Sequence, residues 1–217
     1  SFPFVLAHGE EDGEIALVQT LTSASLTVLL FTSLFVGVII VYTFLCKDLR
    51  RQKMLLFLSI AIPILLATFF LMGTTLSKNY VSETKGPVHW HADFEILSCR
   101  ERVDQLLDPS GFTNRIGTSL FHEHDDNRIH VEGKVLRLTD IELHKFFDVI
   151  GGELTEDMLR IPTNTGTFEQ KNSDLCNGTR GAWQMFVYKT HDGIVAQEKV
   201  YDFENYLLSP ESMIPPG

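Results

Sequence analysis

Two long apolar runs near the N-terminus constrain the fold of this chain more than any other feature. No Asp, Glu, Lys or Arg occurs from Ile15 to Cys46, and a second charge-free run extends from Met54 to Ser77. A helix rises about 1.5 Å per residue, so about 20 residues cross a hydrocarbon core of about 30 Å, and each run exceeds that length. Buried helices of a soluble domain are the alternative, but adjacent charge-free runs are rare in soluble folds. We therefore expect transmembrane helices at residues 21–46 and 54–77.

The charges that flank the two runs predict their orientation. The connection at residues 47–53 carries four cations and one anion, whereas positions 10–14 carry four acidic residues and no cation. Short basic loops stay in the cytoplasm. The sequence therefore predicts a cytoplasmic loop at 47–53 in a two-span protein of the cell membrane, with the lipid bilayer as a partner. Residues 1–20 and 78–217, and hence both termini, are expected on the extracytoplasmic side.

The first residues carry a second signal. Ser1 to Ala7 reads like the end of a signal-peptide apolar region, and Val-Leu-Ala before His8 fits the small-residue cleavage rule. Residues 1–20 are therefore interpreted as an extracytoplasmic segment with a possible signal-peptide remnant. Cleavage would make His8 the N-terminal residue, which offers an amine and an imidazole to one copper ion. The sequence leaves this open as an additional ligand.

The charge of the extracytoplasmic domain restricts its partners. The chain has 18 basic and 28 acidic side chains, of which four basic and five acidic precede Lys78, so the domain has 14 and 23 and a net charge of −9 with neutral histidine. Nucleic acid is repelled by such a surface, and cations are attracted to it. A metal ion is thus expected as a partner and nucleic acid is not.

Two of the three cysteines fall in this domain. Cys99 and Cys176 would lie in a compartment where disulfides persist, whereas Cys46 is at the cytoplasmic end of the first helix. We predict a bridge between Cys99 and Cys176. Two free thiols remain the alternative, because sequence does not supply the separation of the Cβ atoms.

Two segments of the domain alternate in hydrophobicity and place histidines opposite the core. In Val88 to Leu97 the apolar face is Trp90, Ala92, Phe94 and Ile96, and the opposite face carries His89 and His91. In Arg128 to Lys134, Ile129 and Val131 face inward, and His130 and Glu132 share the other face. This placement weakens the interpretation of His89 and His91 as ordinary core residues.

The remaining patterns complete the fold prediction. Thr139-Asp140-Ile141-Glu142 matches a capping box and predicts a helix to about Ile150, stopped by Gly151-Gly152, with a buried stripe of Ile141, Phe146, Val149 and Ile150. Trp183 to Lys189 and Ile194 to Tyr201 predict a β-hairpin around Asp192-Gly193. The expected fold class is a two-helix transmembrane hairpin plus an extracytoplasmic α+β domain with a small mixed or antiparallel sheet.

Five of the eight histidines gather within 42 positions of the domain and form the candidate metal site. They are His89, His91, His122, His124 and His130. Histidines two apart on a strand point the same way, so the nitrogens of each HxH pair can reach one ion. Nearby carboxylates can orient the imidazoles or act as further ligands, namely Asp93, Glu123, Asp125, Asp126 and Glu132. A polar face that is merely rich in histidine is the alternative.

The ligand types restrict the metal and the function. Imidazole and carboxylate without cysteine fit a copper or zinc ion best. Copper is favoured slightly by the affinity order, and availability could reverse that preference. The leading hypothesis is a non-enzymatic metal-binding protein, acting alone or as an accessory subunit of a membrane complex. The alternatives are a hydrolytic or oxidoreductase metalloenzyme with Glu123 or Glu132 as general base, and a metal-free interaction module.

Four segments carry a resemblance to other proteins: GPVHWHADFEI, LFHEHDDNRIHVEG, KFFDVIGG and SPESMIPPG. With them the chain resembles a group of uncharacterised prokaryotic membrane-anchored proteins that share an HxH strand and an HxHD…HVE block, over roughly residues 86–217. The resemblance brings no assigned activity. It implies that the five histidines belong to one pattern and that a further strand follows Gly217.

Overall fold

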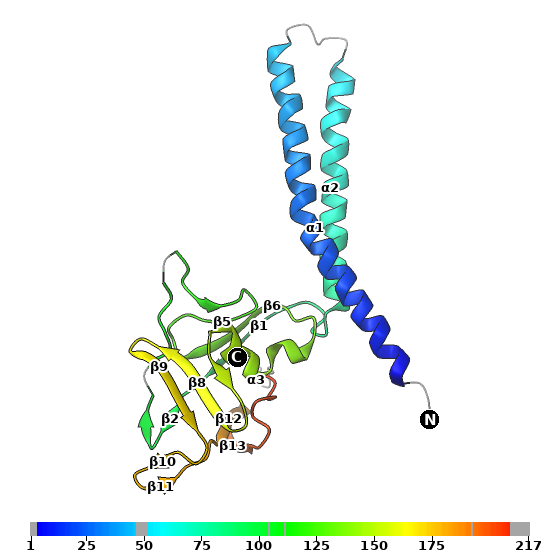
Figure 1. Cartoon of the computed structure of the whole chain (residues 1–217). Helices are drawn as coiled ribbons and strands as arrows, with labels where there is room; N and C mark the ends of the chain where they lie inside the picture. The colour runs from blue at the N-terminus through cyan, green and yellow to red at the C-terminus, as the bar shows by residue number, and fades with distance from the viewer. Residues whose placement is uncertain (1–3, 47–51, 104, 111, 192, 209–217) are drawn as a thin grey trace. The chain divides into compact units, whose positions relative to one another are not determined.

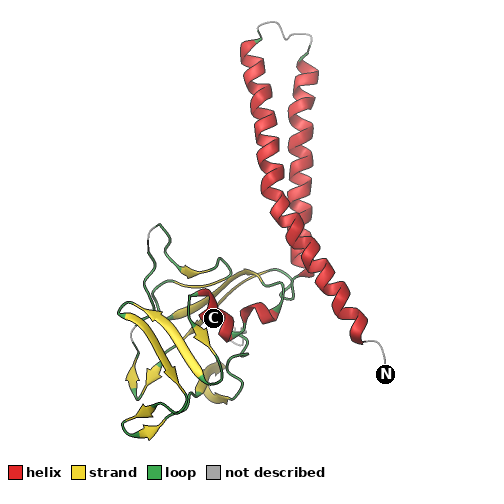
Figure 2. Ribbon diagram, viewed as in Figure 1, coloured by secondary structure: helices red, strands yellow, loops and turns green. Residues whose placement is uncertain are grey.

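The computed structural model describes residues 4–46, 52–103, 105–110, 112–191 and 193–208. The chain divides into two compact units, Ser1–Lys85 and Gly86–Gly217, which are described separately below. The first unit is helical, and the second, called the C-terminal domain here, is built mainly of strands (Figures 1 and 2). Residues 47–51 of the predicted basic loop lie outside the described ranges.

The first unit is a hairpin of two long helices, α1 (Phe4–Leu45) and α2 (Lys53–Val81), which lie side by side (Figure 1). The helix α1 therefore includes most of the segment that precedes the predicted span, and the His8 side chain is not among the described ones. The hydroxyl oxygens of Ser25 and Thr74 are 3.5 Å apart across the hairpin. Pro63 lies inside α2, which continues through it.

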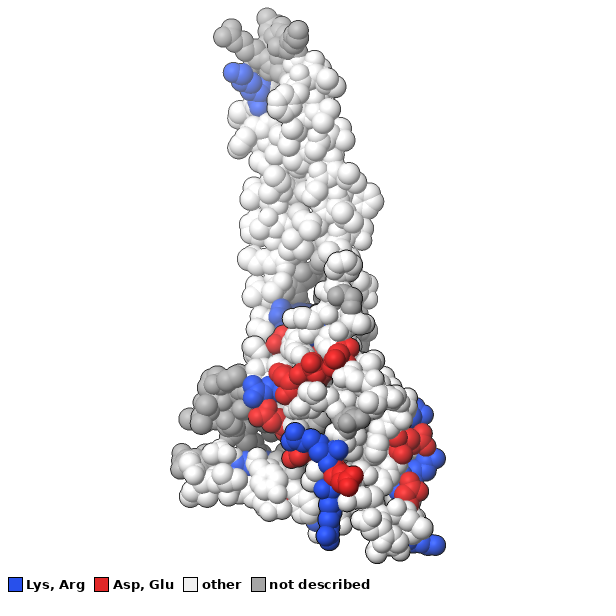
Figure 3. All heavy atoms as spheres, turned by 90° about the vertical axis from the view of Figure 1, so that its left-hand side faces the viewer, with Lys and Arg blue, Asp and Glu red and all other residues white. Residues whose placement is uncertain are grey.

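The surface of the hairpin is apolar. The segments Ile15–Leu45 and Lys53–Val81 are long and apolar enough to cross a membrane. Large side chains such as Leu30 and Phe31 on α1 and Leu66 on α2 are mostly exposed, whereas core helices of a soluble protein would bury them. On the face shown in Figure 3, charged side chains gather on the C-terminal domain and are absent along most of the hairpin. Such a surface suits contact with lipid.

The C-terminal domain is built around a four-stranded sheet with the order β1-β6-β5-β4. Its strands are β1 (Pro87–Asp93), β4 (Ile116–Gly117), β5 (Phe121–Glu123) and β6 (Arg128–Lys134). The alternating segment at 128–134 forms the whole of β6, as predicted. The strand predicted to reach Leu97 ends earlier, at Asp93. The Phe94 amide still donates to the carbonyl of Asn127 at 3.0 Å, but Asn127 adopts φ +52° in the turn before β6, so the pairing goes no further.

The other strands form smaller sheets. A three-stranded sheet contains β7 (Glu153–Leu154), β8 (Met158–Thr163) and β9 (Gly166–Lys171), and two-stranded ones pair β2 (Leu97–Ser98) with β3 (Glu101–Arg102), β10 (Leu175–Cys176) with β11 (Thr179–Arg180), and β12 (Met185–His191) with β13 (Ile194–Val200). Each described pairing is antiparallel. The antiparallel form of the prediction is thus confirmed, and the described residues contain no mixed sheet. The predicted hairpin is also confirmed, although its first strand is Met185–His191 and not Trp183–Lys189, and Asp192 of the predicted turn lies outside the described residues.

The predicted capping box is wrong. Residues Leu138–Ile141 form a 3-10 helix, η1, and the α-helix α3 (Leu143–Val149) begins after an extended Glu142 with φ −64° and ψ 150°. The cause is tertiary: the amides of Leu143 and His144 donate to carbonyls of the C-terminal segment, at 2.9 Å each. The end of the helix is as predicted, since Gly151 adopts φ +86°, a conformation that favours glycine.

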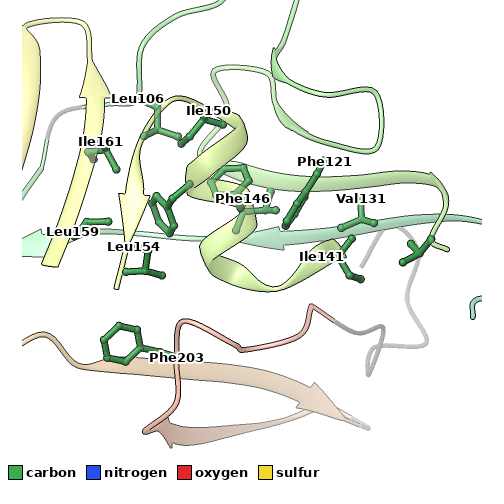
Figure 4. Close-up of a cluster of buried hydrophobic side chains, with 13 residues drawn as sticks. Leu106, Phe121, Val131, Ile141, Phe146, Ile150, Leu154, Leu159, Ile161 and Phe203 are labelled. Atoms are coloured by element: carbon green, nitrogen blue, oxygen red, sulfur yellow. The ribbon is translucent and has the colours of Figure 1, made fainter. Parts of the chain in front are cut away.

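The core lies between α3 and the inner face of the four-stranded sheet (Figure 4). The Phe146 ring is centred 5.4 Å from Phe121 and 5.8 Å from Phe94, and Ile129 and Val131 of β6 are buried beside them. Of the predicted stripe, Ile141, Phe146 and Ile150 are buried and Val149 is half-buried. Because this face of the sheet packs on α3, alternation directs the histidines of β1, β5 and β6 to the opposite face.

A disulfide between Cys99 and Cys176 ties the β2–β3 turn to β10, with the Cα atoms 5.1 Å apart. This confirms the predicted pairing and removes the alternative of two free thiols. The Gln170 side chain lies against both sulfurs and accepts a hydrogen bond from Ser98 at 2.6 Å. The bridge thus joins the two short hairpins β2–β3 and β10–β11.

Candidate metal centre

Three histidines stand side by side on adjacent strands. In the antiparallel register His91 of β1 pairs with His130 of β6, and His130 pairs with His122 of β5. The ring centroids are 4.4 Å apart for His91 and His130, and 5.4 Å apart for His122 and His130. The sheet register therefore brings one member of each HxH pair to the same row, with His130 in the middle.

Glu132 lies one row further along β6, on the same face. It pairs with His89 in the ladder, and its Oε1 is 3.0 Å from the His89 Nε2. Its Oε2 is 3.8 Å from the Nε2 of His122. The carboxylate thus lies between a histidine of β1 and a histidine of β5.

His124 follows directly after β5 and turns back toward the row. Its Nδ1 is 2.6 Å from the Asn114 carbonyl, and its Nε2 is 3.1 Å from the Nε2 of His122. A carbonyl oxygen only accepts hydrogen bonds, so Nδ1–H is the donor. In the neutral ring this leaves the lone pair on Nε2, directed at His122, as a metal ligand requires.

His130 is oriented by Asp126. The Nε2–H donates to the carboxylate Oδ2 at 3.0 Å, which leaves the lone pair of the neutral ring on Nδ1. That Nδ1 is buried and has no hydrogen-bond partner among the described residues, and the same holds for the Nδ1 of His122. Buried polar atoms without a partner are rare in proteins, and coordination to an ion would supply the partner that the His130 nitrogen lacks.

The ligand atoms converge into two overlapping groups. One contains His89, His91, His130 and Glu132, and the other contains His122, His124, His130 and Glu132; within each group the ligand atoms lie within 4.8 Å of one another. Metal–nitrogen bonds of about 2.0 Å in a tetrahedron place ligand atoms about 3.3 Å apart, so small side-chain rotations suffice to close either group. All five predicted histidines are brought together, and Glu132 joins them.

The electrostatics of the cluster favour the neutral form of His122. Burial lowers the pKa of His122 to about 4, and the charges of His124, His130 and Arg115 act in the same direction against that of Glu132. His122 is therefore neutral near pH 7, the form that binds metals. Burial acts to raise the pKa of Asp126, but the hydrogen bond from His130 and the nearby Arg128 outweigh it and lower that pKa.

The acidic turn between β5 and β6 shapes the site. Asp125 and Asn127 adopt φ +67° and +52°, which these residue types tolerate better than most. Glu123 Oε1 accepts the Asp126 amide at 2.8 Å, and Asp126 in turn accepts the Arg128 amide at 3.2 Å. Of the carboxylates expected near the metal, Asp126 contacts a histidine of the row and Glu132 joins the cluster. Glu123 supports the turn and burial raises its pKa, whereas Asp93 pairs with Arg128.

Gly117 allows β4 to approach β5 beside the site. It pairs with His122 at φ +108°, and a Cβ built there would lie 2.6 Å from the carbonyl oxygen of Phe121 and 3.1 Å from the His122 Cα. Sequence analysis missed this residue, as it missed the Asn114 carbonyl and the particular role of Asp126. Glu132, by contrast, could be found from the sequence, because the His130-x-Glu132 spacing places it on the histidine face.

The other histidines do not join the cluster. The Nδ1 of His144 on α3 is 3.0 Å from the Glu204 carbonyl, and His144 belongs to neither group of candidate ligands. His191 ends β12, and its side chain, like that of His8, is not among the described ones.

Comparison of the chain with protein-family models, curated proteins and solved structures finds no match. The functional conclusion therefore rests on the chemistry of the site itself.

Proposed function

We propose that this chain is a membrane-anchored protein whose C-terminal domain binds copper or zinc on the extracytoplasmic side. The observation that carries the proposal is the convergence of five imidazoles and one carboxylate on one face of the sheet, with ligand atoms of each group within 4.8 Å. One member of each HxH pair, His91 of β1 and His122 of β5, flanks His130 through strand register. A polar face that is rich in histidine by chance does not require such convergence.

The donor set supports the choice of metal. Imidazole nitrogen and one carboxylate suit zinc and copper, whereas calcium and magnesium prefer oxygen ligands. The Nδ1–H of His124 and the Nε2–H of His130 donate to a carbonyl and to a carboxylate, the arrangement that usually fixes metal-binding histidines. Copper ranks above zinc in the general affinity order.

Three features support the location. The helical hairpin is apolar on its exposed surface, the connection at 47–53 is basic, and the C-terminal domain contains a disulfide, which persists in oxidising compartments. A two-span anchor that carries one metal-binding domain suits metal capture at the membrane surface, alone or as an accessory subunit of a larger complex. The proposal includes membership in the histidine-rich membrane-anchored group that the sequence resembles.

Metal binding is favoured over catalysis by the state of the two candidate bases. Glu123 is held in the turn by the Asp126 amide, and Glu132 contacts His89 within the cluster. A metalloenzyme needs a carboxylate that is available to a metal-bound water. In the described structure Glu132 contacts His89 instead, and the Glu123 side chain is buried in the turn, with Oε1 bonded to the Asp126 amide and Oε2 without a hydrogen-bond partner.

The test is metal analysis of the purified 217-residue chain in detergent, prepared with an affinity tag that lacks histidine. After chelation and dialysis against copper or zinc, the wild type should retain metal, and the His91→Ala/His124→Ala variant should lose most of it. His144→Ala is the matched control and should bind as the wild type does. Absence of metal from the wild type, or equal stoichiometry in the double variant, would show that the proposed function is wrong and would favour the metal-free interaction module.

A further inference from the structure

The two oxygens of Glu132 face different histidine pairs. Oε1 is 3.0 Å from the Nε2 of His89 on β1, and Oε2 is 3.8 Å from the Nε2 of His122 on β5. A carboxylate that chelates a single ion directs both oxygens to one point. Here the oxygens are directed to opposite sides of β6, where the two HxH pairs lie.

The cluster holds more ligands than one ion uses. Six side chains converge, whereas zinc in proteins is usually four-coordinate, so an ion in either group leaves the HxH pair of the other group without a metal. A carboxylate can bridge two ions about 3.5 to 4 Å apart, as in two-metal sites generally. The two groups share only His130 and Glu132, which is the arrangement that such a bridge requires.

We propose that the cluster binds two metal ions, one on His89 and His91 and the other on His122 and His124, with the Glu132 carboxylate as the bridge. His130 completes the coordination of one of them through Nδ1. This inference rests on the proposed function and adds the number of ions and the role of each pair.

The surrounding charge supports two divalent cations. Imidazoles are neutral ligands, so Glu132 alone would offset one of four positive charges. Asp126 bonds to His130 and adds a second carboxylate beside the cluster. The negative charge of the domain as a whole also lowers the cost of bringing two cations together.

The two ions differ in access to solvent. The side chain of His89 is 62% exposed, whereas that of His122 is fully buried. The ion on the β1 pair should therefore exchange faster than the ion on the β5 pair. This gradient gives a metal-capturing domain an outer position that receives or releases metal and an inner one that retains it.

Metal stoichiometry separates this inference from the proposed function. With copper or zinc, the wild type should bind two ions per chain above the background of a variant in which His89, His91, His122 and His124 are all alanine. His89→Ala/His91→Ala and His122→Ala/His124→Ala should each retain one ion, and His144→Ala should retain two. One ion in the wild type would overturn the two-ion inference and leave the proposed function intact, whereas none would overturn both.

Electron paramagnetic resonance of the wild type tests the bridge without relying on variants that fold poorly. With two equivalents of Cu²⁺, ions this close should give a broadened spectrum and a half-field signal, and with the Glu132→Gln variant the half-field signal should be lost. An isolated-copper spectrum from the wild type at full loading would overturn the inference. A chelator added in small steps should remove the first equivalent much faster than the second, and equal rates would contradict the assigned difference in access.

Discussion

The Nε2 atoms of His122 and His124 face each other at 3.1 Å, and the Asn114 carbonyl holds the proton of His124 on its other nitrogen. Either His122 donates its Nε2–H across this gap, or a metal ion lies between the two lone pairs. The buried His122 ring does not take up a proton near pH 7, because burial lowers its pKa to about 4. The metal-free domain thus contains a buried neutral histidine whose protonation opposes folding.

The first prediction is that the metal-free domain loses stability in acid. Folding lowers the pKa of His122 from its usual value of 6.5 to about 4, so between pH 6.5 and pH 4 the unfolded chain binds a proton that the folded chain does not. The free energy of unfolding should therefore fall as the pH drops from 6.5 to 4, by up to about 3 kcal/mol. Chemical unfolding followed by tryptophan fluorescence measures it, since both tryptophans lie in the domain.

His122→Leu should remove most of this pH dependence, because leucine does not titrate. His144→Leu is the matched control, since it removes a histidine outside the cluster, and it should keep the wild-type slope. An unchanged slope in His122→Leu would mean that other groups cause the acid sensitivity.

The second prediction concerns Gly117, whose substitution should damage the site without touching a ligand. In Gly117→Ala the new methyl would lie 2.6 Å from the Phe121 carbonyl, so β4 must separate from the strand that carries His122. We expect a loss of about 1 to 3 kcal/mol in stability and weaker metal binding. Gly166→Ala is the control, because its φ is +137° but no atom lies within 4 Å of the added Cβ. If both variants bind metal equally, close packing at Gly117 does not position the site.

Local patterns in the sequence were sufficient for several elements. The apolar runs predicted α1 and α2 because helix length and apolar composition are properties of a single segment. The strict alternation at 128–134 predicted β6 and the face on which His130 and Glu132 lie. For the same reason the HxH pairs could be recognised as potential ligands before the strands were paired.

Features that depend on pairing between distant segments could not be predicted. The capping box failed because backbone hydrogen bonds to the C-terminal segment keep Glu142 extended, and these contacts join residues about 60 positions apart. The row of His91, His130 and His122 depends on the register of three strands, which the sequence does not state. The Asn114 carbonyl is a backbone atom of a loop and leaves no signal in the side-chain pattern.

The third prediction is that the Cys99–Cys176 bridge contributes about 4 kcal/mol to the stability of the domain. The bridge joins residues 77 positions apart, so it removes many conformations from the unfolded chain. The Cys99→Ala/Cys176→Ala variant should show this loss in chemical unfolding. Cys46→Ala removes the thiol that forms no bridge and should leave the domain unaffected. Equal unfolding midpoints for the double variant and the wild type would contradict the prediction.

The fourth prediction is the membrane topology, with the basic connection in the cytoplasm and the C-terminal domain outside. Gln52 at the start of α2 and Glu101 of β3 in the domain are both exposed, so cysteines placed there can react. In a Cys46→Ala background, Glu101→Cys should be labelled by a membrane-impermeant maleimide on intact cells, and Gln52→Cys only after permeabilisation. Cys46→Ala alone should remain unlabelled, because its other cysteines form the disulfide. The reverse pattern would contradict the prediction. It would place the candidate metal site in the cytoplasm and four cations of a short loop on the outer side, against the positive-inside rule.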